Sequence, residues 1–351
     1  MRIVIGTGKG LSPDGPKLAL GVLRYRPDDV VAVIDAMHAG KTTADVTGDG
    51  TTEPKPVVAD LAAALSYRPD TFLVGPSLRR QAITPRFRAQ VMAAIGTGLN
   101  VISGLHYILG DDAAISEAAR GRGVRIWDLR RAGDDGDVAQ YRPHRAGSWT
   151  TVAVGSDCST GKMTTMLEVE REARERGLSS EFVATGQTGI LIAGRGVPAD
   201  HIISDFLPGA IEAAVLDAAS RHDWVFVEGQ GALNHPAYSP VTLGIIHGAS
   251  PDSMILCHRS SSDTLLHEPQ CRIPALRELV AINEQAANWL GRAVPSEVVA
   301  IALNTSQLPA PMAHAELARV AEETGLPTAD PVRFGAGPLL DAVIEARISS
   351  S

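Results

Sequence analysis

Short apolar runs rich in β-branched residues alternate with longer Ala- and Leu-rich segments along the first part of the chain. The short runs predict strands at residues 2–5, 30–34, 71–74, 99–102 and 124–126. The segments between them predict helices at residues 17–23, 57–64, 85–95 and 113–120. Strands that alternate with helices form βαβ units, so this part predicts an α/β domain with a parallel sheet.

The second part of the chain repeats this alternation. Its apolar runs predict strands at residues 149–154, 181–184, 224–227, 253–257 and 297–303. Apolar residues at helical spacing predict a helix between residues 276 and 290, and residues 315–323 and 338–346 predict closing helices. A second α/β domain is therefore expected.

A polar stretch without periodicity, residues 129–148, separates the two parts. Such a stretch marks a domain boundary. We predict a first domain at residues 1–135, a linker at residues 136–148 and a second domain at residues 149–351, and the length of 351 residues suits two domains.

Composition narrows the classes of partner. The net charge is −8 and aromatic residues make up 4% of the chain, so it lacks the basic surface and stacking platforms of nucleic-acid binders. The same acidic balance argues against binding to anionic membranes.

Three cysteines without paired spacing argue against a disulfide framework and exclude a four-thiolate zinc site. No apolar run suits a signal peptide or a membrane span, so we expect a cytoplasmic protein, and we expect it to form a homo-oligomer.

The strongest motif follows the strand predicted at residues 149–154. It reads Gly155-Ser156-Asp157-Cys158-Ser159-Thr160-Gly161-Lys162-Met163-Thr164, and a helix-compatible segment follows it. A strand, a glycine-rich turn with Gly-Lys and a helix start form a P-loop, whose N–H groups, helix N-terminus and lysine bind phosphate. We predict that residues 156–164 bind a phosphorylated cofactor, with Lys162 at its outer phosphates.

Two positions depart from the usual P-loop pattern. Ser156 stands where the first glycine is expected, as in dethiobiotin synthetase-like loops, and Met163 stands where a hydroxyl would bind Mg²⁺. The second change argues against ordinary Mg-ATP chemistry, whereas a pyrophosphate such as that of coenzyme A needs no metal. Cys158 could be a nucleophile of lowered pKa or merely a small residue that lines the loop.

A second glycine-rich loop follows the strand predicted at residues 224–227. Glu228 ends that strand, where a Walker-B-like carboxylate would face the P-loop, and Gln230 and His235 follow it. Ligands bind beyond the carboxyl ends of such strands. We predict that Glu228 and His235 are catalytic and that Gln230 contacts substrate. The alternatives are a strand-end charge and a turn histidine.

Other candidates lie at the same predicted edge. Gln187 and Thr188 follow the second strand of this domain, Asp205 precedes a helix, and Asn304 follows the last strand. We predict substrate contacts for the first two and a cofactor contact for Asn304. Asp205 is either catalytic or an N-cap. We expect no metal site, because no His, Asp and Glu cluster has zinc-like spacing.

The first domain offers weaker signals. Residues 6–10 read Gly-Thr-Gly-Lys-Gly after a strand, but the dinucleotide fingerprint fails because Leu11 stands at its third glycine. Asp35, at the end of the second strand, could bind a ribose. His38-Ala39-Gly40-Lys41 resembles a P-loop fragment, although the residues after it are poor helix formers. We predict that Lys41 and His106 bind substrate.

These motifs together resemble a two-domain family that joins an N-terminal Rossmann-like domain to a C-terminal P-loop domain and includes D-glutamate N-acetyltransferases of the DgcN type. The matching segments are residues 38–41, 104–106, 155–164, 187–189, 205, 228–231, 235–236 and 251–258. The resemblance implies acetyl-CoA as donor and an amino acid as acceptor. It also implies the fold: a Rossmann-like parallel sheet followed by a P-loop NTPase-like α/β domain.

Two functions follow from these motifs. The first is transfer of an acetyl group from acetyl-CoA to an amino acid such as D-glutamate. In this reaction Glu228 or His235 would deprotonate the amine, backbone N–H groups of residues 229–231 would stabilise the oxyanion, and Lys41 and Arg195 would bind the acceptor carboxylate. The alternative is an ATP-dependent kinase or carboxylate-activating enzyme in which Glu228, Asp157 and Thr164 hold Mg²⁺. Besides these two enzymes, the motifs also allow a non-enzymatic nucleotide sensor, which would bind its ligand without turnover.

Overall fold

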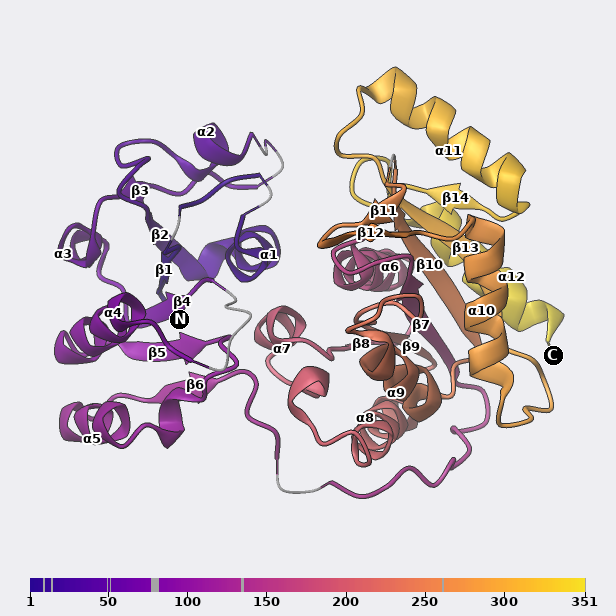
Figure 1. The fold of residues 1–351 in the computed structure, drawn as a ribbon, viewed down its shortest axis with the longest axis horizontal. Coiled ribbons are helices and arrows are strands. Elements are labelled where there is room, and N and C mark those ends of the chain that lie inside the picture. The colour runs from indigo at the N-terminus through magenta and orange to yellow at the C-terminus, as the bar shows by residue number, and fades with distance from the viewer. Residues whose placement is uncertain are drawn as a thin grey trace. The chain divides into compact units, whose positions relative to one another are not determined.

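A computed structural model describes residues 1–350 except residues 9, 14, 49, 51, 77–81, 134, 135 and 261. The chain divides into two compact units (Figure 1). Unit 1 comprises Met1–Ala132 and Ile190–His201, and unit 2 comprises Gly133–Gly189 and Ile202–Ser351. Among the described residues, no helix is long and apolar enough to cross a membrane. The predicted α/β class is confirmed, with a parallel six-stranded sheet in each unit.

The sheet of unit 1 has the strand order β3-β2-β1-β4-β5-β6, and all its neighbours are parallel. The first strand, β1, lies in the middle of the sheet; β2 and β3 follow on one side of it, and β4, β5 and β6 follow on the other. This order creates a switch point between β1 and β4, beyond whose carboxyl ends ligands bind in such folds. The strands are β1 (Ile3–Gly6), β2 (Val30–Ile34), β3 (Val57–Val58), β4 (Thr71–Val74), β5 (Asn100–Ser103) and β6 (Ile126–Asp128).

Helices cover this sheet and bury its apolar residues. The core joins Phe72 of β4 to Val91 and Ile95 of α4. Capping side chains define where helices begin, as when the Thr84 hydroxyl accepts a hydrogen bond from the N–H of Phe87 at the start of α4. The helices are α1 (Lys17–Tyr25), α2 (Thr43–Thr47), α3 (Leu61–Ala64), α4 (Pro85–Gly96) and α5 (Ala113–Arg122), with short 3₁₀ turns at Pro27–Asp29, Leu65–Tyr67 and Leu109–Asp111.

Two local predictions in unit 1 are wrong. The helix expected at residues 57–64 begins only at Leu61, where the Asp60 carboxylate accepts the N–H of Ala63, because the β-branched pair before it forms β3. The residues after Lys41 do form a helix, α2, because Thr42 and Asp45 make a capping box. Tertiary pairing and capping thus override weak local propensity.

The sheet of unit 2 has the order β14-β13-β10-β7-β9-β8, again wholly parallel. The first strand of this unit, β7, lies inside the sheet between β10 and β9. The strands are β7 (Trp149–Gly155), β8 (Ser180–Val183), β9 (Trp224–Val227), β10 (Ser253–Arg259), β13 (Glu297–Asn304) and β14 (Thr328–Ala329), and a small hairpin pairs β11 (Thr264–Leu265) with β12 (Glu268–Arg272).

The helices of unit 2 form two layers. One contains α6, which packs on β7, β8 and β9 and against α12; the other contains α8 and α9, with α10 packed against α9. The closing helix expected at residues 315–323 begins earlier, after Pro309. The helices are α6 (Lys162–Glu175), α8 (Leu207–Arg221), α9 (Ser239–Ala249), α10 (Leu276–Asn288), α11 (Ala310–Thr324) and α12 (Gly337–Ser349).

One segment of the later sequence belongs to unit 1. Helix α7 (Gln187–Ala193) starts in unit 2, and Ile190–His201, which ends in a 3₁₀ turn at Ala199–His201, packs with unit 1. Arg130, only 3% exposed, holds this segment: its Nη2 lies 2.9 Å from Oδ2 of Asp200. The sequence prediction had placed the whole of residues 149–351 in one domain. The contact that ties residues 190–201 to unit 1 is made by Arg130, and the hydrophobic pattern gives no indication that this arginine is buried.

Candidate functional site

The P-loop of unit 2 joins β7 directly to α6. The strand ends at Gly155 and the helix begins at Lys162, so residues 156–161 form the turn. Two turn residues adopt positive φ: Ser159 at 64° and Gly161 at 104°. Gly161 precedes the helix immediately, which lets the chain enter the helix sharply. The first turn of α6 then carries Met163 and Thr164, both half-buried.

Lys162 lies within this loop and is 5% exposed. Its Nζ donates hydrogen bonds to the carbonyl oxygen of Asp157, at 2.6 Å, and to Oγ1 of Thr160, at 3.3 Å. Two glycines lie against this side chain. A Cβ at Gly155 would lie 2.8 Å from the Lys162 Nζ. A Cβ at Gly229 would lie 3.1 Å from the Lys162 Cδ and would overlap the carbonyl oxygen of Ala153.

Neighbouring strands brace the loop. The hydroxyl of Ser156 lies 2.8 Å from Nδ1 of His258, at the end of β10. Asn234 Nδ2 donates to the carbonyl of Ser156 at 2.9 Å, and Arg259 Nη2 donates to that of Ser159 at 2.9 Å. Burial lowers the pKa of His258 to about 4, so this histidine is neutral near pH 7. The hydroxyl that replaces the first glycine therefore has a specific partner, which the sequence alone did not suggest.

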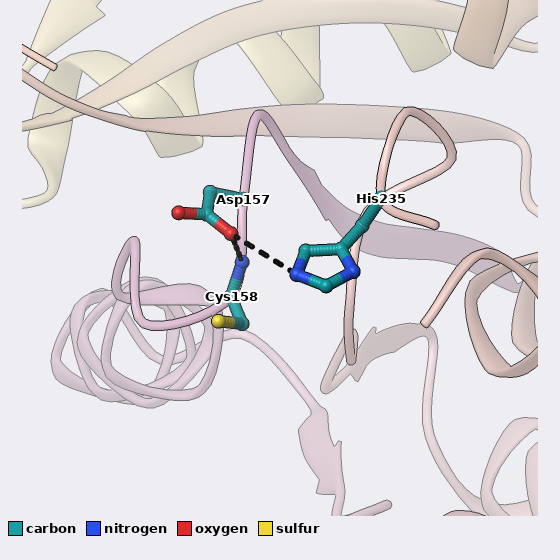
Figure 2. A group of neighbouring side chains, drawn as sticks. All are labelled: Asp157, Cys158 and His235. Atoms are coloured by element: carbon teal, nitrogen blue, oxygen red, sulfur yellow. Dashed lines mark hydrogen bonds and ion pairs between the residues drawn. The ribbon is translucent and has the colours of Figure 1, made fainter. Parts of the chain in front are cut away.

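Three side chains meet at the mouth of the loop: Asp157, Cys158 and His235 (Figure 2). Their possible ligand atoms lie within 4.8 Å of one another. His235 is 2% exposed, and its Nε2 lies 3.9 Å from Oδ1 of Asp157. That Nε2 is buried and has no hydrogen-bond partner in the described part of the chain. The sequence spacing gave no sign of this group.

The backbone fixes the tautomer of His235. Its Nδ1 accepts a hydrogen bond from the N–H of Ala237 at 3.1 Å, and a backbone N–H can only donate. The neutral ring therefore carries its proton on Nε2, the atom that faces Asp157. A metal ion would need a lone pair on that atom. Both oxygens of Asp157 are also engaged, by the N–H groups of Cys158 at 2.6 Å and Leu266 at 2.7 Å. The group is therefore not arranged to hold a metal, and the Nε2–H of His235 can donate a hydrogen bond to an acceptor on a ligand.

Glu228 turns toward the β8–α7 connection. Its Oε2 accepts hydrogen bonds from the N–H groups of Thr185, at 2.9 Å, and Gly186, at 3.0 Å. The carboxylate is buried, with the residue 6% exposed. Gln230 strengthens the same connection, because its Nε2 donates to the carbonyl of Thr185. Glu228 and Gln230 thus hold the turn that presents Gln187.

The remaining predicted residues of unit 2 are dispersed along its loops. Thr188 is buried and Gln187 half-buried in the first turn of α7. Asn304 is half-buried, and its Oδ1 accepts the N–H of Ser306 at 3.0 Å. Asp205 is exposed in the turn before α8, where the Ser204 hydroxyl lies 3.4 Å from its carboxylate. Across the described residues, no hydrogen bond or ion pair links Asp205 to the P-loop.

The other predicted substrate residues belong to unit 1. Lys41 is exposed before α2, and Arg195 is exposed on the segment 190–201. His106 is half-buried and stacks on His201, with ring centroids 6.2 Å apart. Burial and the positive charge of Arg130 lower the pKa of His106. Lys9, in the glycine motif after β1, lies outside the described residues.

The fold and the loop define a class: a protein with a Rossmann-like unit followed by a P-loop α/β unit. Family comparison agrees. Residues 138–340 match a family model described as the "Domain of unknown function (DUF1611_C) P-loop domain", and residues 36–132 match its Rossmann-like N-terminal domain. The chain belongs to the DUF1611 family.

Individual relatives cover nearly the whole chain. A protein of Tritonibacter scottomollicae named D-glutamate N-acetyltransferase is 36% identical over 95% of this chain and 96% of its own. A Pseudoalteromonas protein of the same name is 33% identical over 76% of this chain and 78% of its own. The crystal structure of a DUF1611 family protein from Anabaena variabilis, 34% identical, superposes with a TM-score of 0.90 over 98% of this chain and 100% of that one. The resemblance found in the sequence is confirmed.

Proposed function

We propose that this protein is an amino-acid N-acetyltransferase that transfers the acetyl group of acetyl-CoA to the amine of a D-amino acid, with D-glutamate as the first acceptor to test. The observation that carries the proposal is the name shared by two relatives, one of them 36% identical over 95% of this chain. Function does not follow from fold alone, so the proposal is weighed against the geometry of the site.

The P-loop suits the phosphates of a coenzyme A derivative. Lys162 supplies a positive charge, and α6 supplies its N-terminus. The N–H groups of Ser156 and Cys158 already donate to Cys257 and Asp157, so the backbone N–H groups for phosphate would come from residues 159–161. His235 adds a buried Nε2–H without a hydrogen-bond partner among the described residues, and an anion would satisfy it. Bound acetyl-CoA would supply the activated acetyl thioester; this chain would bind and orient it.

The roles that we assign to Glu228 and His235 follow the contacts that each residue makes. Glu228 already accepts two backbone N–H groups, so we assign it a positioning role for the β8–α7 connection that carries Gln187 and Thr188. His235 is held as a proton donor by Ala237, so we assign it hydrogen-bond donation to a bound anion.

The geometry is less suited to the alternative, an ATP-dependent enzyme. Mg²⁺ in P-loop enzymes needs the hydroxyl after the lysine and a free Walker-B carboxylate. Met163 occupies the first position, and one oxygen of Glu228, Oε2, already accepts the amides of Thr185 and Gly186. Titration calorimetry compares the two ligands directly. We expect heat of binding with acetyl-CoA; binding of Mg-ATP without binding of acetyl-CoA would reject the proposal.

Turnover tests the reaction itself. The protein is incubated with acetyl-CoA and a panel of D- and L-amino acids, and release of the free thiol is followed. We expect release that depends on a D-amino acid. A matched reaction without acceptor measures simple hydrolysis of the thioester, and release that is equal in both would contradict acyl transfer.

A further inference from the structure

Unit 1 contains a cavity of about 800 Å³ that no part of the proposed function uses. It lies beyond the carboxyl ends of β1 and β2 and beside α4. Ile34 and Phe72 form part of its floor, and Ala89 and Ala93 contribute an apolar wall from α4. The volume falls within the range of small-molecule sites, and its mostly apolar lining with a few polar groups is typical of them.

The cavity lies at the position where a sheet of this strand order binds nucleotides. Beside the switch point between β1 and β4, the residue that follows β2 is an acidic one, Asp35. In sheets of this order an acidic residue at the end of the second strand accepts the ribose hydroxyls of a nucleotide. Asp35 lines the cavity and is 4% exposed.

Asp35 retains capacity for a further hydrogen bond. Its Oδ2 faces the N–H of Leu11 at 2.8 Å and Nδ1 of His38 at 2.7 Å, and its Oδ1 accepts the N–H of Met37 at 3.0 Å. A carboxylate has about four acceptor positions, so one remains on Oδ1. Burial alone would raise the pKa of Asp35, but the bonds from His38 and the two amides lower it, which keeps the group an anion and an acceptor.

A second polar group in the lining, the side-chain amide of Gln90, has an oxygen that could accept a hydrogen bond from a ligand. Oε1 of Gln90, on α4, is buried and has no hydrogen-bond partner among the described residues. A buried acceptor without a donor is unfavourable, and a ligand N–H group would satisfy it. The amide of glutamine is also the group that matches the N6 and N7 edge of adenine.

In the described part of the connection after β1, two backbone N–H groups that could face a diphosphate are already engaged. The N–H of Leu11 donates to Asp35, and that of Thr7 donates to the carbonyl of Ile34 at 3.3 Å. Helix α1 begins only at Lys17, after Pro16, so its N-terminus does not follow the strand directly. The features that remain are those for a base and a ribose.

We propose that this cavity binds an adenosine moiety, with the base against Ala89 and Ala93, its amino edge at Gln90 and a ribose hydroxyl at Asp35. The proposal concerns unit 1 alone and does not depend on the proposed acetyl transfer. The same moiety could arrive as the free nucleoside or within a dinucleotide, and the test separates these sources.

The test is titration calorimetry of the full-length protein with adenosine. We expect one site per chain. Gln90→Leu keeps the shape but removes the acceptor and should weaken binding about tenfold. Ala93→Phe fills the exposed mouth of the cavity and should abolish binding. Ala114→Phe, at an exposed position of α5 outside the cavity, is the matched control and should bind adenosine as the unchanged protein does.

Ligand variants test the site without risk to folding. Removal of both ribose hydroxyls, in 2′,3′-dideoxyadenosine, should weaken binding about tenfold. NAD should bind no more than tenfold tighter than adenosine, because the N–H groups of Thr7 and Leu11 are already engaged within the protein. Lys162→Ala should leave adenosine binding unchanged. The proposal is overturned if adenosine does not bind at all. Unaltered adenosine binding in Ala93→Phe, or loss of it in Lys162→Ala, would also overturn it. Equal affinity for the dideoxy nucleoside, or much tighter binding of NAD, would contradict it as well.

Discussion

The two units carry parallel sheets that end very differently at their carboxyl edges. In unit 2, β7 leads into α6 through residues 156–161, and the loop encloses Lys162. In unit 1, β1 is separated from α1 by residues 7–16, and a largely apolar cavity lies at the edge. Both strand orders thus leave room beyond the strand ends, but the connection after the first strand differs: in unit 2 it closes around a buried lysine, and in unit 1 it borders a mostly apolar cavity.

The largest expected effect is the loss of stability when alanine replaces a glycine whose missing Cβ allows two backbone segments to approach closely. In unit 2, Gly229→Ala would place a Cβ against the carbonyl oxygen of Ala153 on β7. We expect the free energy of unfolding to fall by about 5 kcal/mol or more, measured by denaturant titration.

The matched control in unit 1 is Gly121→Ala, because nothing lies within 4 Å of a Cβ built at this helical position. It should raise the free energy of unfolding by about 0.5–1 kcal/mol. Equal destabilisation by the two substitutions would refute the argument from close approach.

The second prediction concerns the segment 190–201, which leaves unit 2 to pack with unit 1. Arg130→Met removes the buried partner of Asp200 and should cost about 4 kcal/mol. Amide hydrogen exchange in residues 190–201 should accelerate with it. The neighbouring Arg131 pairs with Asp111 at the surface, their side chains 50% and 67% exposed. Asp111→Asn breaks only this surface pair and leaves Arg131 beside the buried Asp128, so it should cost less than about 1 kcal/mol. Similar costs for Arg130→Met and Asp111→Asn would argue against Arg130 as the anchor.

The third prediction uses pH to probe the bracing of the P-loop. Burial lowers the pKa of His258 to about 4 in the folded protein, from the ordinary histidine value of about 6.5. Between these values the unfolded chain binds the additional proton, so the stability contributed by neutral His258 is complete above pH 6.5 and is lost as the pH falls toward 4. The loss is about 3 kcal/mol.

A variant isolates this contribution from those of other groups. In His258→Gln the decline in unfolding free energy between pH 7 and 4 should be smaller by that amount, measured by denaturant titration at each pH. An identical pH dependence in both proteins would show that His258 is not the group responsible.

The smallest expected effect tests the donor role of His235. His235→Leu removes the Nε2–H and should weaken binding of acetyl-CoA about tenfold in calorimetry. His235→Gln keeps an N–H donor and should bind within about threefold of the unchanged protein. If His235 acted instead as a base, both variants would retain affinity for acetyl-CoA and lose turnover equally.

Much of this arrangement could be predicted from the sequence. The strands at residues 30–34, 71–74 and 224–227 have the expected bounds, because β-branched runs in buried parallel strands leave little ambiguity. The P-loop was recognisable because its function depends on contiguous residues, and its strand, turn and helix are where the motif predicts them.

Long-range partners could not be predicted in this way. The contact of Ser156 with His258 depends on the pairing of β7 with β10, and the tautomer of His235 depends on one backbone N–H. The Arg130–Asp200 pair joins residues from opposite sides of the expected domain boundary. Such relations exist only in the folded chain. Glu228 illustrates the point, because its position at a strand end gives no indication that two backbone amides donate to its Oε2.

The most direct test of the central claim compares the unchanged protein with Lys162→Ala in one reaction. Each is incubated with acetyl-CoA and D-glutamate, and the amino-acid product is identified by mass spectrometry. The account predicts N-acetyl-D-glutamate from the unchanged protein and at least a hundredfold less from the variant, with similar thermal unfolding of both. An absence of acetylated product, or equal product from both proteins, would contradict it.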